Sequence, residues 1–498
     1  MISQLLFGAT LFAAAKSTLA TNSSTSRPGV DCACSALLQK NPDSVLLPAS
    51  ATFEAQTKHF WDIRSAVIPS CMVFPSNADE VSEALTVLAS CNAQFAVRGG
   101  GHMNFPGSNN IEGGVLLALN NITDMSVDEA ASTIAVRPGN TWADVYGALD
   151  PYGLYTNGGR MKTVGVPGLT LIGGFHYFIN KWGYTMDSVK SYDVVLGNGT
   201  QVVATSTCNS DLFWALKGGA NNFGIVTKFV LQAYKVPQIS TTIQSFDEAS
   251  IEKFIQATSE MTINDDGQVG AGSVVSINYN VTTDVISGLL LGVQEGTESP
   301  PSRFSAYTNI PPTMQINNVT TPKVWHSDKE TPNQMFRVQF AHHTVRADAS
   351  ARLYEIYQAW KVAVSEIKDV EGLYPTFVLN VMPKSAASVA KNNGVGNVWG
   401  LPDDESLIIW QLSTGWANAE DDLRMTAWAK NFLEYHHAIN QAMGIASEFL
   451  YMGDAGEFQN PYLGFPAENV QRLRDVRSRY DPGQVFTKLN WGGFKLSI

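Results

Sequence analysis

The segment from Arg98 to His102, "RGGGH", places a histidine directly after three consecutive glycines. Glycine leaves backbone N–H groups uncovered and permits positive φ angles, so such a loop forms a concave nest for an anion. Two further glycine-rich segments follow, "TVGVPGLTLIGG" over residues 163–174 and "KGGANNFGIVT" over residues 217–227. No segment has the glycine spacing of a Rossmann or P-loop motif. Three such loops predict an extended ligand that contains a pyrophosphate; ordinary tight turns are the alternative.

The elements that must position these loops differ between the two halves of the chain. From about residue 69 to 235, short strand patterns such as "CMVFP" and "GIVTKFVLQAY" are punctuated by glycines, and "SNADEVSEALTVLASCN" and "TWADVYGALDPYG" predict helices. A hairpin turn is expected at residues 197–199. After about residue 236, alternating segments and two long helical patterns predict an antiparallel sheet covered on one side by helices. The fold class expected is α+β, with a two-lobed first domain beside this second one.

Size and charge limit the function classes. A chain of 498 residues exceeds one ordinary core, so at least two domains are expected. The formal charge of -12 offers no basic surface for nucleic acid or anionic lipid, and both roles are set aside. Past the N-terminus no apolar segment is long enough to span a membrane, so we expect the mature protein to be soluble.

The N-terminus predicts secretion. The apolar run over residues 2–15, followed by "KSTLA", is typical of a signal peptide cleaved near Ala20, with a disordered or buried helix as the alternative. Glycosylation is expected at the Asn-x-Ser/Thr sites, which are Asn22, Asn121, Asn198, Asn280 and Asn318.

The cysteines and histidines do not predict a metal site. In an oxidising compartment Cys32 or Cys34 can bridge to Cys91, and the odd count of five leaves at least one free thiol. The "CAC" spacing does not suit metal binding, and the adjacent histidines at 342–343 and 436–437 diverge on a strand or a helix.

Several long motifs in register resemble one family. The segments "VRGGGH", "TVGVPGLTLIGG", "MDSVKSYDVVLGNG", "DLFWALKGGANNFGIVTKF" and "YDPGQVFTKLNWGGFKL" resemble those of FAD-linked oxidases with a PCMH-type flavin domain. This is the berberine-bridge-enzyme-like branch of the vanillyl-alcohol-oxidase superfamily, and its secreted fungal members look most similar. The resemblance implies a signal peptide (1–20), an extension packing on the flavin domain (21–66), a PCMH-type FAD-binding domain (67–237), a substrate domain (238–450) and a C-terminal segment returning to the FAD domain (451–498).

The resemblance also implies the flavin-binding residues. His102 is expected to bond covalently to the 8α-methyl of FAD, since an imidazole nitrogen is a good nucleophile toward the activated flavin. Many members add a second link through a cysteine, but Met161 occupies that position, so a single link is predicted. The expected FAD contacts are Arg98, Gly99, Gly100, Gly101, His102, Gly107, Thr163, Val164, Gly165, Gly168, Gly173, Gly174, Asn222, Gly224, Ile225 and Val226.

Three residues are candidates for proton transfer. Tyr451 matches the tyrosine of the family's Tyr-x-Asn segment, although Gly453 replaces the asparagine, and a tyrosine base requires a lowered phenol pKa. Asp454 is the second candidate. His176 is either a proton carrier facing the flavin or a packed, hydrogen-bonded histidine.

The resemblance implies an oxidase whose partners are a small organic substrate and O₂. The substrate gives a hydride to flavin N5 and O₂ becomes H₂O₂. Alternatives are a non-redox cyclase or isomerase, an oligosaccharide oxidase, and a binding protein without turnover. Substrate selectivity is expected from the inner face of the second-domain sheet, roughly residues 244–413. The oligomeric state is not predicted.

Overall fold

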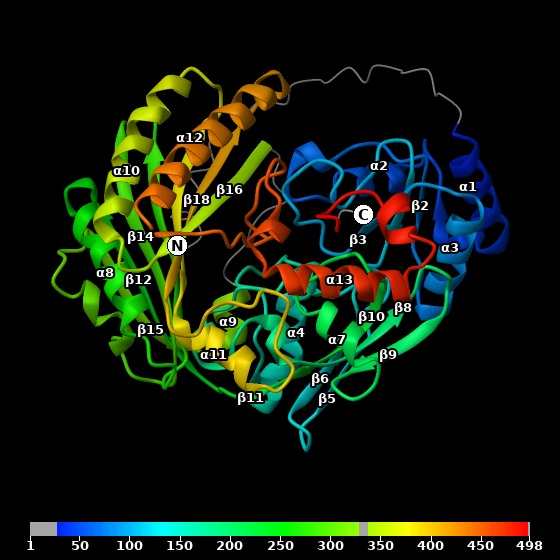
Figure 1. Cartoon of the computed structure of the whole chain (residues 1–498), viewed down its shortest axis with the longest axis horizontal. Helices are drawn as coiled ribbons and strands as arrows, with labels where there is room; N and C mark the ends of the chain where they lie inside the picture. The colour runs from blue at the N-terminus through cyan, green and yellow to red at the C-terminus, as the bar shows by residue number, and fades with distance from the viewer. Residues whose placement is uncertain (1–26, 328–336, 497–498) are drawn as a thin grey trace.

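The computed structural model describes residues 27–327 and 337–496 and contains two lobes, shown side by side in Figure 1. One lobe holds sheets of four, five and two strands, and the other holds a single sheet of eight strands. The predicted signal peptide and the Asn22 site lie outside the described residues.

The four-stranded sheet carries the first glycine loop at the end of β3. Its strands, in spatial order, are β1 (Val45–Leu46), β2 (Cys71–Val73), β4 (Val115–Ala118) and β3 (Phe95–Arg98). The predicted helix is present as α3 (Ala78–Ser90), whose Asn77 side chain caps the N–H of Glu80. Its apolar residues at helical spacing pack on the sheet together with those of α1 (Pro28–Lys40).

Two disulfides attach α1 to this sheet. Cys32 bonds to Cys91, which is one of the two pairings expected from the sequence. Cys34 bonds to Cys71, a second bridge that the sequence did not predict. Residues two apart on a helix point about 200° from each other, so each cysteine reaches a different partner. Cys208 is free and exposed.

The five-stranded sheet completes the first lobe and is antiparallel throughout. Its order is β5 (Met125–Asp128), β6 (Thr133–Val136), β10 (Ile225–Gln232), β8 (Val189–Val195) and β9 (Gln201–Thr205). The predicted hairpin at 197–199 joins β8 to β9 and is confirmed. A two-stranded sheet joins β7 (Leu154–Tyr155) to β11 (Tyr234–Lys235). The helices of this region are α4 (Trp142–Leu149), α5 (Val166–Leu171), α6 (Ile179–Trp182), α7 (Ser210–Ala215) and the C-terminal α13 (Ala467–Tyr480).

The second lobe is one antiparallel sheet. Its order is β15 (Met314–Thr320), β12 (Ile239–Asp247), β14 (Val285–Glu295), β13 (Ala271–Asn280), β17 (Tyr374–Met382), β18 (Leu407–Trp416), β16 (Arg337–Arg346) and β19 (Ala446–Ser447). Helices α8 (Ile251–Ile263), α10 (Ser350–Val364) and α12 (Asp422–Ala442) cover its outer face (Figure 1). The expected α+β class, with helices on one side of an antiparallel sheet, is confirmed.

The inner face of this sheet is not fully closed by the first lobe. Asn278, Thr376, Ser413 and Phe340 are aligned across strands β13, β17, β18 and β16, and we call them the cross-strand row. Asn278, Ser413 and Phe340 are half-exposed, whereas Thr376 is buried. The Phe340 ring lies 5.2 Å from that of Trp61 on the first lobe. The row therefore lies on the side of the sheet that meets the first lobe.

Candidate active site

The first two glycine loops touch each other through their backbones. A Cβ on Gly100 would stand 2.4 Å from the backbone nitrogen of Gly165, so the approach excludes any side chain there. The contact brings His102 beside Thr163, with 2.9 Å between the imidazole Nε2 and the hydroxyl oxygen. Trp61 stacks on the imidazole at a centroid distance of 6.0 Å.

The surroundings of His102 favour a neutral imidazole. Burial, with a smaller contribution from His59, lowers the pKa of His102 to about 4. At neutral pH the ring therefore keeps an unprotonated nitrogen, which is the state a nucleophile requires.

Two predicted flavin contacts have structural partners for their side chains. Arg98 donates to the carbonyl oxygen of Gln56 at 2.9 Å and lies over the Phe60 ring, so only its backbone faces the loop. Burial lowers the pKa of Arg98 to about 10. Asn222 bonds to the hydroxyl of Tyr462 and to the carbonyl oxygen of Phe494, and thus fixes the C-terminal segment.

The other predicted contacts surround the same loops. Gly107 has φ of +77°, and a Cβ there would meet the Trp491 indole at 2.4 Å, so this position requires glycine. At Gly168, by contrast, an added Cβ would meet no described atom within 4 Å apart from its two chain neighbours and the backbone of its own helix. The remaining members flank the loops or begin β10, and they are Gly99, Gly101, Val164, Gly173, Gly174, Gly224, Ile225 and Val226.

The hydrogen-bond donors and acceptors that follow these loops in the chain fit FAD. The amide oxygens of Asn104 and Asn109 are buried and have no donor among the described residues, so they can accept from hydroxyl or N–H groups of a ligand. Lys495, which the sequence analysis missed, donates from Nζ to the neutral Asn490 amide oxygen at 2.8 Å. Burial lowers the pKa of Lys495 to about 7, and a nearby phosphate would favour its charged form.

Asp454 belongs to a hydrogen-bonded network that joins the two lobes. Asn380 of β17 donates from Nδ2 to the Asp454 carboxylate at 2.9 Å and to the Gln411 amide oxygen at 3.1 Å. Arg160 of the first lobe donates to the Asn380 amide oxygen at 3.0 Å. Asn380 and Gln411 lie on the same face as the cross-strand row, since residues two and four apart on a strand share a face.

The Asp454 carboxyl group has a raised pKa. Low-polarity surroundings raise it to about 6, and the positive charge of Arg160 opposes the increase. Near neutral pH the group is a carboxylate whose affinity for a proton is higher than that of an exposed aspartate. Such a group is suited to proton abstraction.

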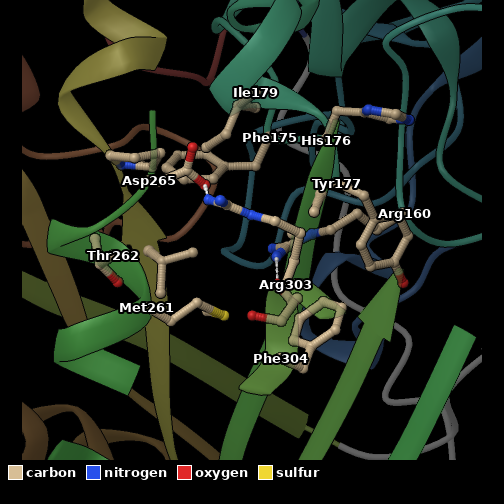
Figure 2. Close-up of a pocket in the computed structure, with 15 residues that line it drawn as sticks. Arg160, Phe175, His176, Tyr177, Ile179, Met261, Thr262, Asp265, Arg303 and Phe304 are labelled. Atoms are coloured by element: carbon tan, nitrogen blue, oxygen red, sulfur yellow. Dashed lines mark hydrogen bonds and ion pairs between the residues drawn. The ribbon is translucent and has the colours of Figure 1, made fainter. Parts of the chain in front are cut away.

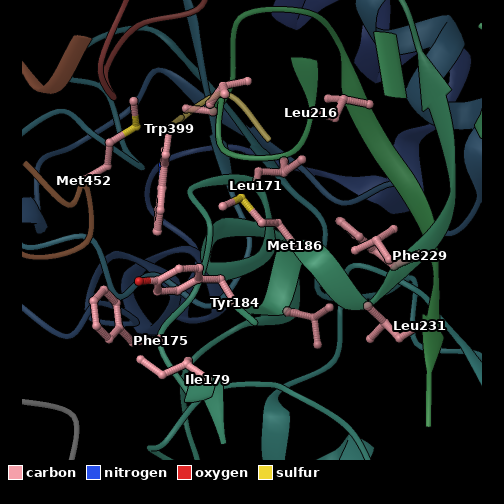
Figure 3. Packing of buried hydrophobic residues seen from close by; sticks show 14 of the residues in the cluster. Leu171, Phe175, Ile179, Tyr184, Met186, Leu216, Phe229, Leu231, Trp399 and Met452 are labelled. Atoms are coloured by element: carbon pink, nitrogen blue, oxygen red, sulfur yellow. The ribbon is translucent and has the colours of Figure 1, made fainter. Parts of the chain in front are cut away.

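Tyr451 is packed rather than exposed. Its ring lies 4.7 Å from that of Phe175 and 5.8 Å from that of Trp399, and Figure 3 shows these two neighbours beside Tyr184 and Met452. A Cβ on Gly453 would come within 2.4 Å of the Tyr451 ring, so this ring position needs the glycine that replaces the family's asparagine. Burial and the charge of Asp454 raise the pKa of Tyr451 well above its usual value, whereas a base requires a lowered pKa.

His176 is buried and hydrogen-bonded within the protein. Its Nδ1 accepts the backbone N–H of Phe178 at 2.9 Å, and its Nε2 lies 2.8 Å from the Tyr155 hydroxyl. That hydroxyl is also 2.5 Å from Nε2 of His326 on α9 (Pro322–Ser327). Burial lowers the pKa of His176 well below its usual value. These contacts favour the packed, hydrogen-bonded alternative.

Sequence reasoning missed Arg160 and Asn380, which connect the site. Arg160 precedes Met161, the position of the family's second flavin link, and this proximity was the only signal available. Asn380 is one polar residue in an apolar strand pattern. No helix among residues 27–327 and 337–496 is long and apolar enough to cross a membrane. The same residues contain no group of three or more candidate metal ligands, although His343 and His437 stack at 3.7 Å.

Comparisons with known proteins agree with this geometry. A family model described as an FAD binding domain matches residues 69–205. The chain is 32% identical over 93% of its length to FAD-dependent monooxygenase prx3 of Penicillium roqueforti, of which 93% is covered. Its fold is similar to BBE-like 1 of Physcomitrella patens, with a TM-score of 0.76, 18% identity, and coverage of 93% of this chain and 99% of that one.

A carbohydrate oxidase from Microdochium nivale is similar in fold as well. The TM-score is 0.73 at 20% identity, with coverage of 91% of this chain and 98% of that one. With an FAD binding domain and a relative above 30% identity over nearly the whole chain, the protein belongs to the same family of FAD-dependent oxidoreductases as prx3, and it shares its fold with BBE-like 1.

Proposed function

We propose that this protein is a secreted oxidase that takes a hydride and a proton from a small organic substrate and passes both to O₂, forming H₂O₂. FAD supplies the hydride acceptor at N5 and returns the electrons to O₂. The chain itself binds the substrate, orients it and accepts the proton.

The observation that carries this proposal is the state and position of Asp454. Low-polarity surroundings raise the pKa of its carboxyl group to about 6, and the group accepts a hydrogen bond from Asn380 on the inner face of the second-lobe sheet. Asn380 holds one carboxylate oxygen at 2.9 Å, which leaves the other oxygen to accept a proton from a substrate hydroxyl or amine. Tyr451, whose pKa is raised, keeps its proton and serves as a hydrogen-bond donor.

His102 is proposed as the single covalent attachment point for FAD. The neutral imidazole and its contact with Thr163 support this role, because the ring is both nucleophilic and fixed in orientation. Met161 offers no thiol for a second link.

Secretion is proposed from the disulfides and the glycosylation sites. The two bridges suit an oxidising compartment. The sequon asparagines within the described residues are all exposed, and they are Asn121, Asn198, Asn280 and Asn318.

The test is a stoichiometric assay of O₂ uptake and H₂O₂ release on a panel of alcohols, amines and oligosaccharides. One H₂O₂ for each O₂ consumed supports an oxidase. Because the relative from P. roqueforti is named a monooxygenase, the assay is repeated in ¹⁸O₂, and label in the product with no H₂O₂ would contradict the proposal. Product formation without O₂ uptake would instead support a cyclase or isomerase.

A further inference from the structure

A pocket shares Arg160 with the Asp454 network. Its walls come from both lobes, with Arg160 and Phe175 from the first and Met261, Ser273 and Arg303 from the second (Figure 2). The enclosed part of the pocket is small, about 20 Å³, and the pocket opens to solvent at its mouth. Figure 2 shows both guanidinium groups reaching into the pocket, whereas His176 points away from it.

The two arginines differ in how their charges are balanced. Arg303 of the turn Ser302–Tyr307 pairs with Asp265 at 3.1 Å and lies 3.7 Å from Asp266. Arg160 donates to two neutral acceptors, the Ser273 carbonyl oxygen at 3.2 Å and the Asn380 amide oxygen at 3.0 Å.

A guanidinium carries five N–H donors, so these two bonds leave donors of Arg160 for a ligand. Within the part of the chain that the structure describes, no carboxylate lies at salt-bridge distance from Arg160. Arg160 is therefore the cation of this pocket that lacks a direct counter-ion.

The remainder of the wall is suited to an apolar body. Phe175 lies beneath the Arg160 guanidinium, with 5.8 Å to the ring centroid, and Phe304, Met261 and Val381 add apolar surface. The Ser273 hydroxyl is buried and has no partner among the described residues, so it can bond to a polar ligand atom.

We propose that this pocket binds a carboxylate of the substrate on Arg160 and holds an apolar part of the same molecule against Phe175. Arginine binds carboxylates through paired N–H donors more strongly than it binds neutral amides. The inference rests on the proposed oxidase, and it specifies the substrate class as small, largely apolar acids.

This arrangement would hold the reacting carbon near the proposed base. Arg160 and Asp454 both form a hydrogen bond with Asn380. A substrate carboxylate bound to Arg160 would therefore be connected through Asn380 to the Asp454 carboxylate, which accepts the proton. The charge of Arg160 also compensates the repulsion between the two acids.

The test is calorimetric titration of the purified, flavin-bearing protein with benzoate and with benzamide, which share a shape and differ in charge. We expect wild type to bind benzoate about tenfold or more tightly than benzamide, because the charged pair is the stronger bond. Arg160→Gln should erase this preference, and Arg160→Lys should retain part of it. Arg303→Gln is the matched control and should keep the preference, since Asp265 and Asp266 already balance that charge.

Equal affinity for the two probes in wild type, no binding of either, or an unchanged preference in a folded Arg160→Gln variant would overturn the proposal. If thermal melting shows that Arg160→Gln does not fold, an unchanged preference in Arg160→Lys overturns it instead. The titration requires no turnover. A benzoate preference without peroxide release in any assay would therefore contradict only the oxidase, and peroxide release without the preference would contradict only the acid-binding pocket.

Discussion

Two buried aspartates that interact with arginines occupy different regions of this protein and have different consequences. Asp62 and Asp454 both have a pKa raised to about 6 by burial, with an arginine charge opposing the rise. Asp62 contacts Arg64 directly, at 2.9 Å from Oδ2 to Nε, and also accepts the Arg64 backbone N–H. Asp454 reaches Arg160 only through Asn380.

The connections around each pair explain the difference. Arg64 also donates to the carbonyl oxygens of Asn104 and Val338, so it joins the segment before β2, the loop after β3 and strand β16. Its donors are used within the protein. In the Asp454 network, one carboxylate oxygen and several guanidinium donors make no hydrogen bond to a described side chain. Similar pairs therefore act as a structural clamp in one region and as a binding and proton-transfer site in the other.

The largest effect is expected from Asp454→Asn. Loss of the proposed base should lower the rate of H₂O₂ release by about 10²–10⁴-fold, the usual contribution of general base catalysis. Flavin content and folding should remain, because the amide can still bond to Asn380. A wild-type rate in this variant would remove Asp454 from the mechanism.

Asp62→Asn should act on stability instead. Removing Asp62 leaves the buried Arg64 with only the longer contact to Glu457, at 3.5 Å, as a counter-charge, and should lower the free energy of unfolding by about 3 kcal/mol, the lower end for breaking a buried ion pair. Urea denaturation followed by tryptophan fluorescence measures this loss. The double variant Asp62→Asn with Arg64→Met is the control, and it should recover part of the stability. A stable Asp62→Asn protein with slow turnover would contradict the distinction between the two regions.

The pH profile of activity is expected to show a smaller effect. Asp454 accepts a proton only as a carboxylate, so kcat/KM should rise with pH through about 6 and then level off. Arg160 lowers the pKa of Asp454, so Arg160→Gln should move the midpoint to higher pH. A midpoint that stays in place or falls in this variant would show that a different group titrates.

The smallest effect is the pH dependence of stability at Asp454. Its pKa is higher in the folded than in the unfolded chain, so the folded state binds the extra proton and the free energy of unfolding falls as pH rises from about 4 to 6. Asparagine does not titrate. The melting temperature of Asp454→Asn minus that of wild type should therefore be larger at pH 8 than at pH 4. Calorimetric scans of both proteins at both pH values measure this difference.

The fold was largely predictable because its signals are local. The cap at Asn77, the hairpin turn at 197–199 and the alternating strands of the second half each reflect neighbouring residues. The Cys34–Cys71 bridge was missed, because it depends on how α1 lies against β2.

The site was less predictable because it is assembled from distant parts of the chain. Residues 160, 380 and 454 come together only in the folded protein, where the two lobes are in contact. No short motif marks the first two. The packing of Tyr451 over Gly453 depends on the folded backbone, although the replacement of asparagine by glycine signalled a change there.

Flavin attachment at His102 is the most direct test of the proposed active site and its chemistry. The secreted protein and its His102→Ala variant are precipitated with acid, and the flavin absorbance of pellet and supernatant is measured. We expect the yellow chromophore in the wild-type pellet and its loss from the pellet of the variant. Flavin released into the wild-type supernatant would contradict the covalent link, and a colourless protein would contradict the oxidase itself.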